Sequence, residues 1–141
     1  MFGAASALKA EFTPPEVSQS VIITRAAGRT PVPSSESIKS FAAHNATMVI
    51  FLSVGIIEKV RNELIEGGYK TTTPAAIVYK ATWPDEKIMI TTVGELVESA
   101  KKNKIEKTAL IIVGDFLKNT ENKSKLYDRN FPHEYRKGES D

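Results

Sequence analysis

The sequence contains no cysteine. This absence excludes disulfide bonds, thiolate metal ligands and a cysteine nucleophile. No apolar run approaches the roughly 20 residues that a membrane-spanning helix requires. The first residues also lack the basic start and the small-residue cleavage site of a signal peptide. We therefore expect a cytoplasmic protein with no membrane partner.

An excess of one charge sign is also lacking, since 19 Lys and Arg residues stand against 17 Asp and Glu residues. The resulting net charge of +2 is too small to favour nucleic-acid binding. The eight glycines are scattered, and none forms a GxGxxG or Walker-type loop for a phosphate. His44 and His133 are far apart and have no neighbours at metal-ligand spacing. Residue pattern alone therefore predicts neither a metal site nor a catalytic group.

The apolar residues that are present predict five strands in a single domain spanning residues 1–141. Three of the strands are apolar almost throughout, which is typical of strands buried on both faces, whereas 87–92 is expected nearer an edge. The seven-residue connection from 75–79 to 87–92 favours an antiparallel hairpin, so the sheet is expected to be mixed. The predicted strands are 20–24, 47–52, 75–79, 87–92 and 108–114.

Helical periodicity alternates with these strands. An alanine-rich helix is predicted over 2–10, and its lack of a capping residue suggests that the chain begins inside a longer helix. Ser34 or Ser35 is expected to cap a second helix, and Ser53 a third. Thr92 and Glu95 have the spacing of a capping box for the fourth. The apolar positions expected to face the core are Ile38, Phe41, Ala42, Ile56, Ile57, Val60, Leu64, Ile65, Val93, Leu96, Val97 and Ala100.

Gly67-Gly68 is expected to end the third helix. The order of elements predicts an α/β domain, a mixed sheet of about five strands flanked by helices. The polar tail after Phe116 carries Leu126, Tyr127, Phe131 and Tyr135, which predicts that it packs on the body.

Four segments, in collinear order over essentially the whole chain, resemble the tetrapyrrole (corrin/porphyrin) methylase family. They are EVSQSVIITRAAGRTPVP (16–33), AAHNATMVIFLSVG (42–55), TPAAIVYKATWPDEKI (73–88) and SKLYDRNFPHEYR (124–136). The combination of GRTPVP, YKATWPDE and SKLYD resembles the branch that methylates precorrin-4 at C11 more than the uroporphyrinogen branch.

The resemblance implies a two-domain enzyme that holds S-adenosyl-L-methionine between its domains and releases S-adenosyl-L-homocysteine. The glycine-proline-rich loop and the Gly-Asp-Pro stretch that grip this methyl donor belong to the family's N-terminal domain. The present sequence contains neither. The chain therefore resembles the C-terminal domain preceded by one lead-in helix. We expect it to be inactive without the missing N-terminal domain, and the family resemblance implies a homodimer.

For the donor, the resemblance implies contacts from the end of the second strand and from the third strand with the loop after it. Leu52 matches a position that is often methionine in the family, and Ala81 matches a small residue whose backbone faces the donor. A small residue fits there because main chain approaches a flat adenosine closely only without a projecting side chain. Ordinary core packing is the alternative. The implied donor-binding residues are Phe51, Leu52, Pro74, Ala75, Ala76, Ala81 and Thr82.

For the substrate, the resemblance implies precorrin-4 or cobalt-precorrin-4, methylated at C11 in cobalamin biosynthesis. Arg29 is the candidate partner of a substrate carboxylate, because a guanidinium binds carboxylates with two hydrogen bonds. Trp83 is a candidate for packing on the macrocycle. The alternatives are a surface arginine and a packing tryptophan, and at the level of function a methylase of another tetrapyrrole carbon or a non-catalytic binding or dimerisation module.

Overall fold

The computed structural model of the chain describes residues 2–118, and they form one five-stranded sheet with the strand order β1-β2-β5-β3-β4. β1 pairs parallel with β2, and the other three pairings are antiparallel. The predicted mixed α/β sheet is therefore confirmed. The elements are α1 (Phe2–Leu8), β1 (Val21–Thr24), η1 (Ser34–Glu36), α2 (Ile38–Ala42), β2 (Thr47–Ile50), η2 (Val54–Ile56), α3 (Ile57–Gly67), β3 (Pro74–Tyr79), β4 (Lys87–Thr92), α4 (Leu96–Lys102), β5 (Ala109–Val113) and η3 (Asp115–Lys118).

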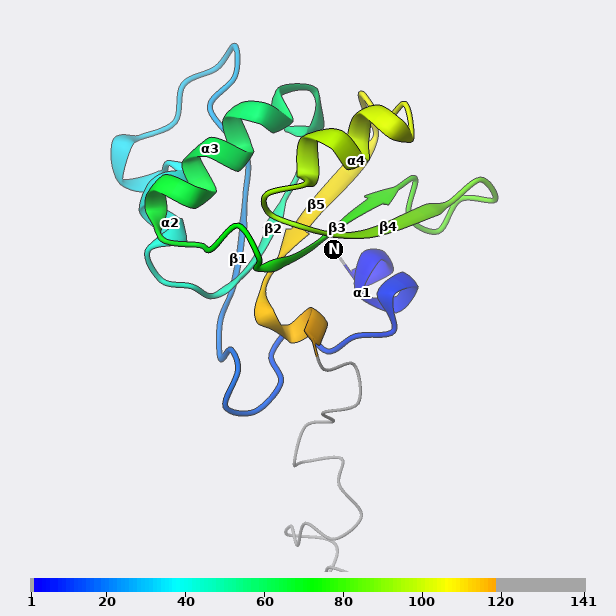
Figure 1. Cartoon of the computed structure of the whole chain (residues 1–141), viewed down its shortest axis with the longest axis horizontal. Coiled ribbons are helices and arrows are strands. Elements are labelled where there is room, and N and C mark those ends of the chain that lie inside the picture. Colours follow the sequence, from blue (N-terminus) through cyan, green and yellow to red (C-terminus); the bar gives the residue numbers. More distant parts are fainter. Residues whose placement is uncertain (1, 119–141) are drawn as a thin grey trace, which may run out of the picture.

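The sheet lies between two unequal layers (Figure 1). Helices α2, α3 and α4 cover one face, where Leu64 packs with strand residues such as Met48 and Ile111. Helix α1 and η3 cover part of the other face, where Val49 packs beneath Phe12. Because alternate strand residues point to opposite faces, β2, β3 and β5 are buried on both sides, as predicted. None of the helices within residues 2–118 combines the length and apolar character needed to cross a membrane.

Strand β4 forms an edge of the sheet, as predicted, and pairs within residues 2–118 only with β3. It shares the less covered face of the sheet with Ala76 and Val78 of β3, because Ile90 and Ile88 lie opposite these residues. The Ile90 side chain is 63% exposed. This half of the face is therefore apolar without being fully covered.

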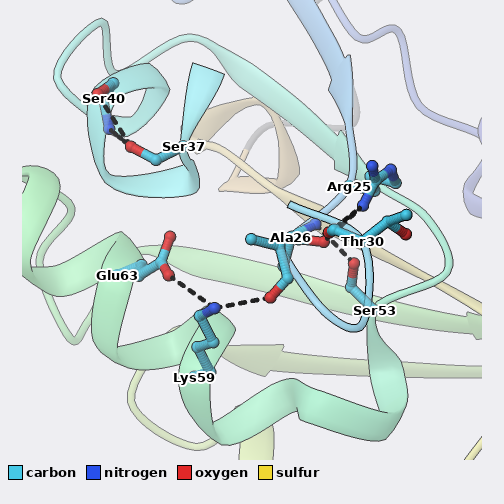
Figure 2. Close-up of polar contacts among 9 residues, drawn as sticks. Arg25, Ala26, Thr30, Ser37, Ser40, Ser53, Lys59 and Glu63 are labelled. Atoms are coloured by element: carbon cyan, nitrogen blue, oxygen red, sulfur yellow. Dashed lines mark hydrogen bonds and ion pairs between the residues drawn. The ribbon is translucent and has the colours of Figure 1, made fainter. Parts of the chain in front are cut away.

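Several predicted helix ends were wrong. Ser37, not Ser34 or Ser35, caps α2, and its hydroxyl accepts the Ser40 N–H at 3.1 Å (Figure 2). Ser37 has the extended backbone that a cap needs, whereas 34–36 already turn as η1. The Thr92–Glu95 capping box does not form, because Thr92 still belongs to β4 and α4 begins at Leu96 without a side-chain cap.

Glycines end α3, as predicted. Gly67 is its last residue, and Gly68 follows with a left-handed φ of 131°, which a glycine adopts without steric cost. Ile65, predicted to face the core, is instead exposed. The tail residues predicted to pack on the body are Leu126, Tyr127, Phe131 and Tyr135. They lie outside the described residues, as do His133 and the segment 124–136.

The strand directions bring several loops to one edge of the sheet. β1 and β2 run in the same direction, and β3 runs with them because both β2 and β3 are antiparallel to β5. The last residues of β1, β2 and β3 therefore lie at the same edge, where β5 and β4 begin. This end of the strands is distinct from the lateral edge that β4 forms, and we call it the carboxyl edge. It comprises residues 25–33, 51–53, 80–86 and 106–108.

Candidate functional site

Four of the eight non-glycine residues with left-handed backbone within residues 2–118 lie at the carboxyl edge. Leu52 has a φ of 54°, Lys80 of 46°, Thr82 of 72° and Thr108 of 59°. Such values are uncommon for ordinary residues and are genuine outliers for a β-branched one such as threonine. Left-handed φ costs about 1–2 kcal/mol per residue, and this kind of strain clusters at ligand-binding sites. Three separate chain segments contribute to it here.

Leu52 combines this strain with exposure. The side chain is 82% exposed, although Ser53 next to it is fully buried. An exposed leucine alone is unremarkable. An exposed leucine held in an unfavourable backbone conformation, two residues after a fully buried strand, is typical of a ligand contact.

The Ser53 side chain does not cap the helix that follows it. Instead it joins two backbone segments of the carboxyl edge. Its hydroxyl accepts the Ala26 N–H at 2.8 Å and donates to the Phe51 carbonyl oxygen at 2.8 Å. Figure 2 shows the bond between Ser53 and Ala26. Ser53 thereby ties the end of β2 to the loop after β1, and its hydroxyl both accepts and donates a hydrogen bond.

The loop after β1 is held by two cations. The Arg25 guanidinium donates to the carbonyl oxygens of Thr30 and Pro31, both at 3.2 Å. Lys59 on α3 donates to the Ala27 carbonyl oxygen at 2.6 Å (Figure 2). Arg25 is therefore committed to the loop itself, whereas the predicted Arg29 is exposed at its tip.

Local hydrogen bonds define the loop between β3 and β4, residues 80–86. The Thr82 N–H donates to Glu86 Oε2 at 2.6 Å, and the Trp83 N–H donates to the Lys80 carbonyl oxygen at 3.0 Å. The Lys80 N–H donates to the Thr108 carbonyl oxygen at 3.0 Å, which joins this loop to the start of β5. The backbone of 80–82 is therefore fixed from two sides.

The ionised groups of this loop stabilise each other. Lys80 Nζ lies 2.6 Å from Asp85 Oδ2. The hydrogen bond to Asp85 is the main cause that raises the pKa of Lys80. The same bond lowers the pKa of Asp85. Both groups are charged at neutral pH.

The structure brings six of the nine predicted site residues to the carboxyl edge. Phe51 and Ala81 are half-buried there, while Trp83 is 57% exposed. The six residues are Arg29, Phe51, Leu52, Ala81, Thr82 and Trp83.

The other three predicted residues lie elsewhere on β3. Pro74 begins the strand, at the opposite edge of the sheet, where its carbonyl oxygen accepts the Gly114 N–H at 3.1 Å. Ala75 and Ala76 follow it, and both are fully buried. Ala75 belongs to the core on the helix-covered face, and Ala76 points to the opposite face. The structure therefore does not bring these three together with the carboxyl edge.

Sequence reasoning missed Thr108 and Lys80. Thr108 stands at the start of β5, between the ends of β2 and β3, because β5 pairs with both strands. No local signal predicts a left-handed threonine, since the strand order creates that requirement. Lys80 was missed because the residues around it in YKATWPDE, before Pro84, carry no turn signal.

Metal-ligating groups do not gather at this edge. Within residues 2–118, no three His, Cys, Asp or Glu side chains are placed to hold one metal ion. His44 is exposed and lines a shallow cavity of about 500 Å³ at the opposite edge, beside Ser18 and Asn45.

Comparison with known proteins places this architecture among enzymes. The family model for tetrapyrrole (corrin/porphyrin) methylases matches residues 1–97. The cobalt-precorrin-4 C(11)-methyltransferase of Methanocaldococcus jannaschii is 56% identical over 97% of this chain and 53% of its own length. The protein of the same name from Priestia megaterium is 46% identical over 98% of this chain and 55% of its own length.

Solved structures agree with these relatives. A cobalt precorrin-4 methyltransferase superposes with a TM-score of 0.80 at 48% identity, over 82% of this chain and 48% of that one. A uroporphyrin-III C-methyltransferase from Thermus thermophilus, complexed with S-adenosyl homocysteine, shares the fold at 21% identity, with a TM-score of 0.66 over 83% of this chain and 48% of that one. The chain spans about half the length of the relatives it matches.

Proposed function

The chain belongs to the tetrapyrrole (corrin/porphyrin) methylase family, and from this membership we propose that it forms the C-terminal half of a methyltransferase. The proposed reaction transfers a methyl group from S-adenosyl-L-methionine to C11 of precorrin-4 or cobalt-precorrin-4 in cobalamin biosynthesis, in the cytoplasm. The observation that carries the proposal is that Leu52 and Ala81-Thr82 lie at the same strained edge of the sheet. The 56% identity to a cobalt-precorrin-4 C(11)-methyltransferase supports the choice of substrate.

The residues of the carboxyl edge fit a flat donor. The exposed Leu52 side chain offers an apolar contact, and Ala81 allows the main chain of the 80–86 loop to come close. When bound, the donor supplies a methyl group already activated on a sulfonium sulfur. The chain therefore needs no nucleophile of its own, and its residues position the reactants and exclude water.

On the substrate side, we assign Arg29 to a carboxylate of the tetrapyrrole and Trp83 to its apolar rim. Arg29 extends from a loop whose backbone Arg25 and Lys59 already hold, so its guanidinium is displayed on a fixed support. Trp83 is more than half exposed beside the proposed donor site. Both assignments rest on the proposed reaction.

The carboxyl edge provides only one wall of a donor site. The eight glycines form no glycine-rich loop, and the family resemblance assigns those loops to the half of the enzyme that this chain does not span. One wall buries roughly half of the ligand surface, while the entropy lost on binding is nearly the same. We therefore predict a donor Kd in the millimolar range or weaker, about −4 kcal/mol, and no turnover by this chain alone.

Calorimetry with S-adenosyl-L-homocysteine tests this prediction. The chain alone is compared with a two-domain protein in which the N-terminal half of a curated relative is joined to it. The two-domain protein should bind and methylate precorrin-4 at C11, whereas the chain alone should do neither. Micromolar binding by the chain alone would refute the one-wall interpretation, and a two-domain protein that binds no donor would refute the proposed function.

We also propose that the chain takes part in a homodimer, which is the non-catalytic role that the structure favours most. The supporting observation is the exposed Ile90 on edge strand β4, because an unpaired apolar edge is a ready surface for another chain. Sedimentation of the chain at increasing concentration measures the assembly. Ile90→Lys should shift it to monomer, and an unchanged dimer would exclude this surface.

A further inference from the structure

The Lys80 side chain is placed among three neighbours of the 79–86 region. Its ammonium group lies 2.6 Å from Asp85 Oδ2, 5.2 Å from the centroid of the Tyr79 ring and 5.5 Å from that of the Trp83 ring. Both ring distances are within the range of a cation–π contact. The Lys80 ammonium group thus contacts Tyr79, the last residue of β3, and both Trp83 and Asp85 in the loop that follows.

The backbone beneath this side chain is strained. Lys80 and Thr82 are both left-handed, and each costs about 1–2 kcal/mol relative to ordinary backbone. Neither residue is a glycine, so contacts must hold the conformation, and the backbone bond from the Lys80 N–H to the Thr108 carbonyl oxygen is one of them. On the Thr82 side, Glu86 accepts the backbone N–H, and on the Lys80 side the ammonium group binds Asp85 and both rings.

The Lys80–Asp85 pair contributes little to global stability. The Lys80 side chain is 25% exposed and that of Asp85 55%, and solvated pairs of this kind are worth little in unfolding experiments. Its effect is local instead, because the pair spans the turn that carries Ala81 and Thr82. Loop geometry and fold stability therefore depend on different residues here.

We propose that Lys80 is a positioning residue of the donor site. Its ammonium group, bound to Asp85 and stacked on Tyr79 and Trp83, holds the 80–86 loop in the left-handed turn that presents the backbone of Ala81 and Thr82. The importance of this turn for the donor rests on the proposed function, whereas the hold on the loop rests on the contacts alone.

The loop carries its own spectroscopic reporter, because Trp83 is the only tryptophan of the chain. Lys80→Met keeps the length of the side chain and removes the charge, while Lys80→Arg restores a cation that binds carboxylates and stacks on rings. Lys70→Met is the control, since the exposed Lys70 precedes β3 at the opposite edge of the sheet.

In the 141-residue chain, Lys80→Met should shift the emission maximum of Trp83 and increase its quenching by acrylamide. Its urea midpoint should stay near that of the parent. Lys80→Arg should restore the parent spectrum, and Lys70→Met should not change it. An unchanged Trp83 signal in a folded Lys80→Met chain would overturn the proposal. If that variant does not fold, Asp85→Asn removes the same pair and decides in its place.

The two-domain protein provides the functional readout. Lys80→Met should weaken donor binding about five- to tenfold and Lys80→Arg should restore it, a rescue that a general loss of structure would not produce. Equal donor affinity of parent and Lys80→Met would overturn the positioning role alone. A parent that binds no donor would instead refute the proposed function, while Trp83 fluorescence would still report whether Lys80 holds the loop.

Discussion

Leu52 offers a test in which stability and function are expected to change in opposite directions. Its φ of 54° costs a non-glycine residue about 1–2 kcal/mol. Glycine removes that cost, but it loses about 0.5–1 kcal/mol more entropy on folding than alanine does. Leu52→Gly should therefore stabilise the chain by roughly 0–1.5 kcal/mol.

Leu52→Ala separates the backbone from the side chain. Because the leucine side chain is 82% exposed, truncating it should change the free energy of unfolding by less than about 0.5 kcal/mol. Alanine keeps the left-handed strain, so the glycine variant should be more stable than the alanine variant by up to about 1.5 kcal/mol. Urea unfolding of the chain with equal m values measures this difference.

Asn62 in the middle of α3 supplies the matched control. At this exposed helical position, Asn62→Ala should be more stable than Asn62→Gly by about 1 kcal/mol. Glycine is thus expected to be the more stable substitution at Leu52, and alanine the more stable one at Asn62. If Leu52→Gly is instead the less stable of its pair, the backbone at Leu52 is not left-handed in solution. In the two-domain protein, both Leu52 variants should bind S-adenosyl-L-homocysteine about five- to tenfold more weakly than the parent.

Two further predictions concern Tyr69 and Gly3. The Tyr69 hydroxyl donates to the Ala46 carbonyl oxygen, and desolvation by burial, followed by the charge of Asp115, raises the pKa of Tyr69 to about 12. Stability that this raised pKa provides is fully present below pH 10 and is lost as pH rises to about 12, a loss of about 2–3 kcal/mol that should be absent in urea titrations of Tyr69→Phe. Gly3→Ala places a Cβ 2.6 Å from Thr82 Cγ2, so it should destabilise the chain by about 1 kcal/mol despite the better helix propensity of alanine. In a Thr82→Ser background the same change should be neutral or stabilising, and a double-mutant cycle without coupling would show that α1 does not contact the loop.

The strands and the hairpin were predictable because their information is local. The three doubly buried strands, the edge strand and the hairpin all follow from apolar runs and the length of one connection. The helix caps were less predictable. Whether Ser34, Ser35 or Ser37 caps α2 depends on which residue has an extended backbone, and the contacts of the preceding loop decide that. Ser53 likewise binds Ala26, a residue 27 positions earlier in the chain.

The candidate site was predictable only in part. The family resemblance selected Leu52 and Ala81, and the structure places both at the carboxyl edge. It also selected Pro74, which lies at the opposite edge, because a resemblance to a segment does not say which end of a strand faces a ligand. Thr108 was missed because its role depends on the position of β5 between β2 and β3.

That position of β5 also explains why one sheet edge can present several strained residues to a single ligand. β2 and β3 each pair with β5, so their ends are separated by two strand spacings, about 10 Å. Direct pairing of β2 with β3 would reduce the separation to about 5 Å and crowd Leu52 against the 80–86 loop. Because β5 runs in the opposite direction, it begins where its neighbours end, and the Thr108 carbonyl oxygen receives the Lys80 N–H. The strand order therefore sets the width of the proposed donor wall and anchors one side of it.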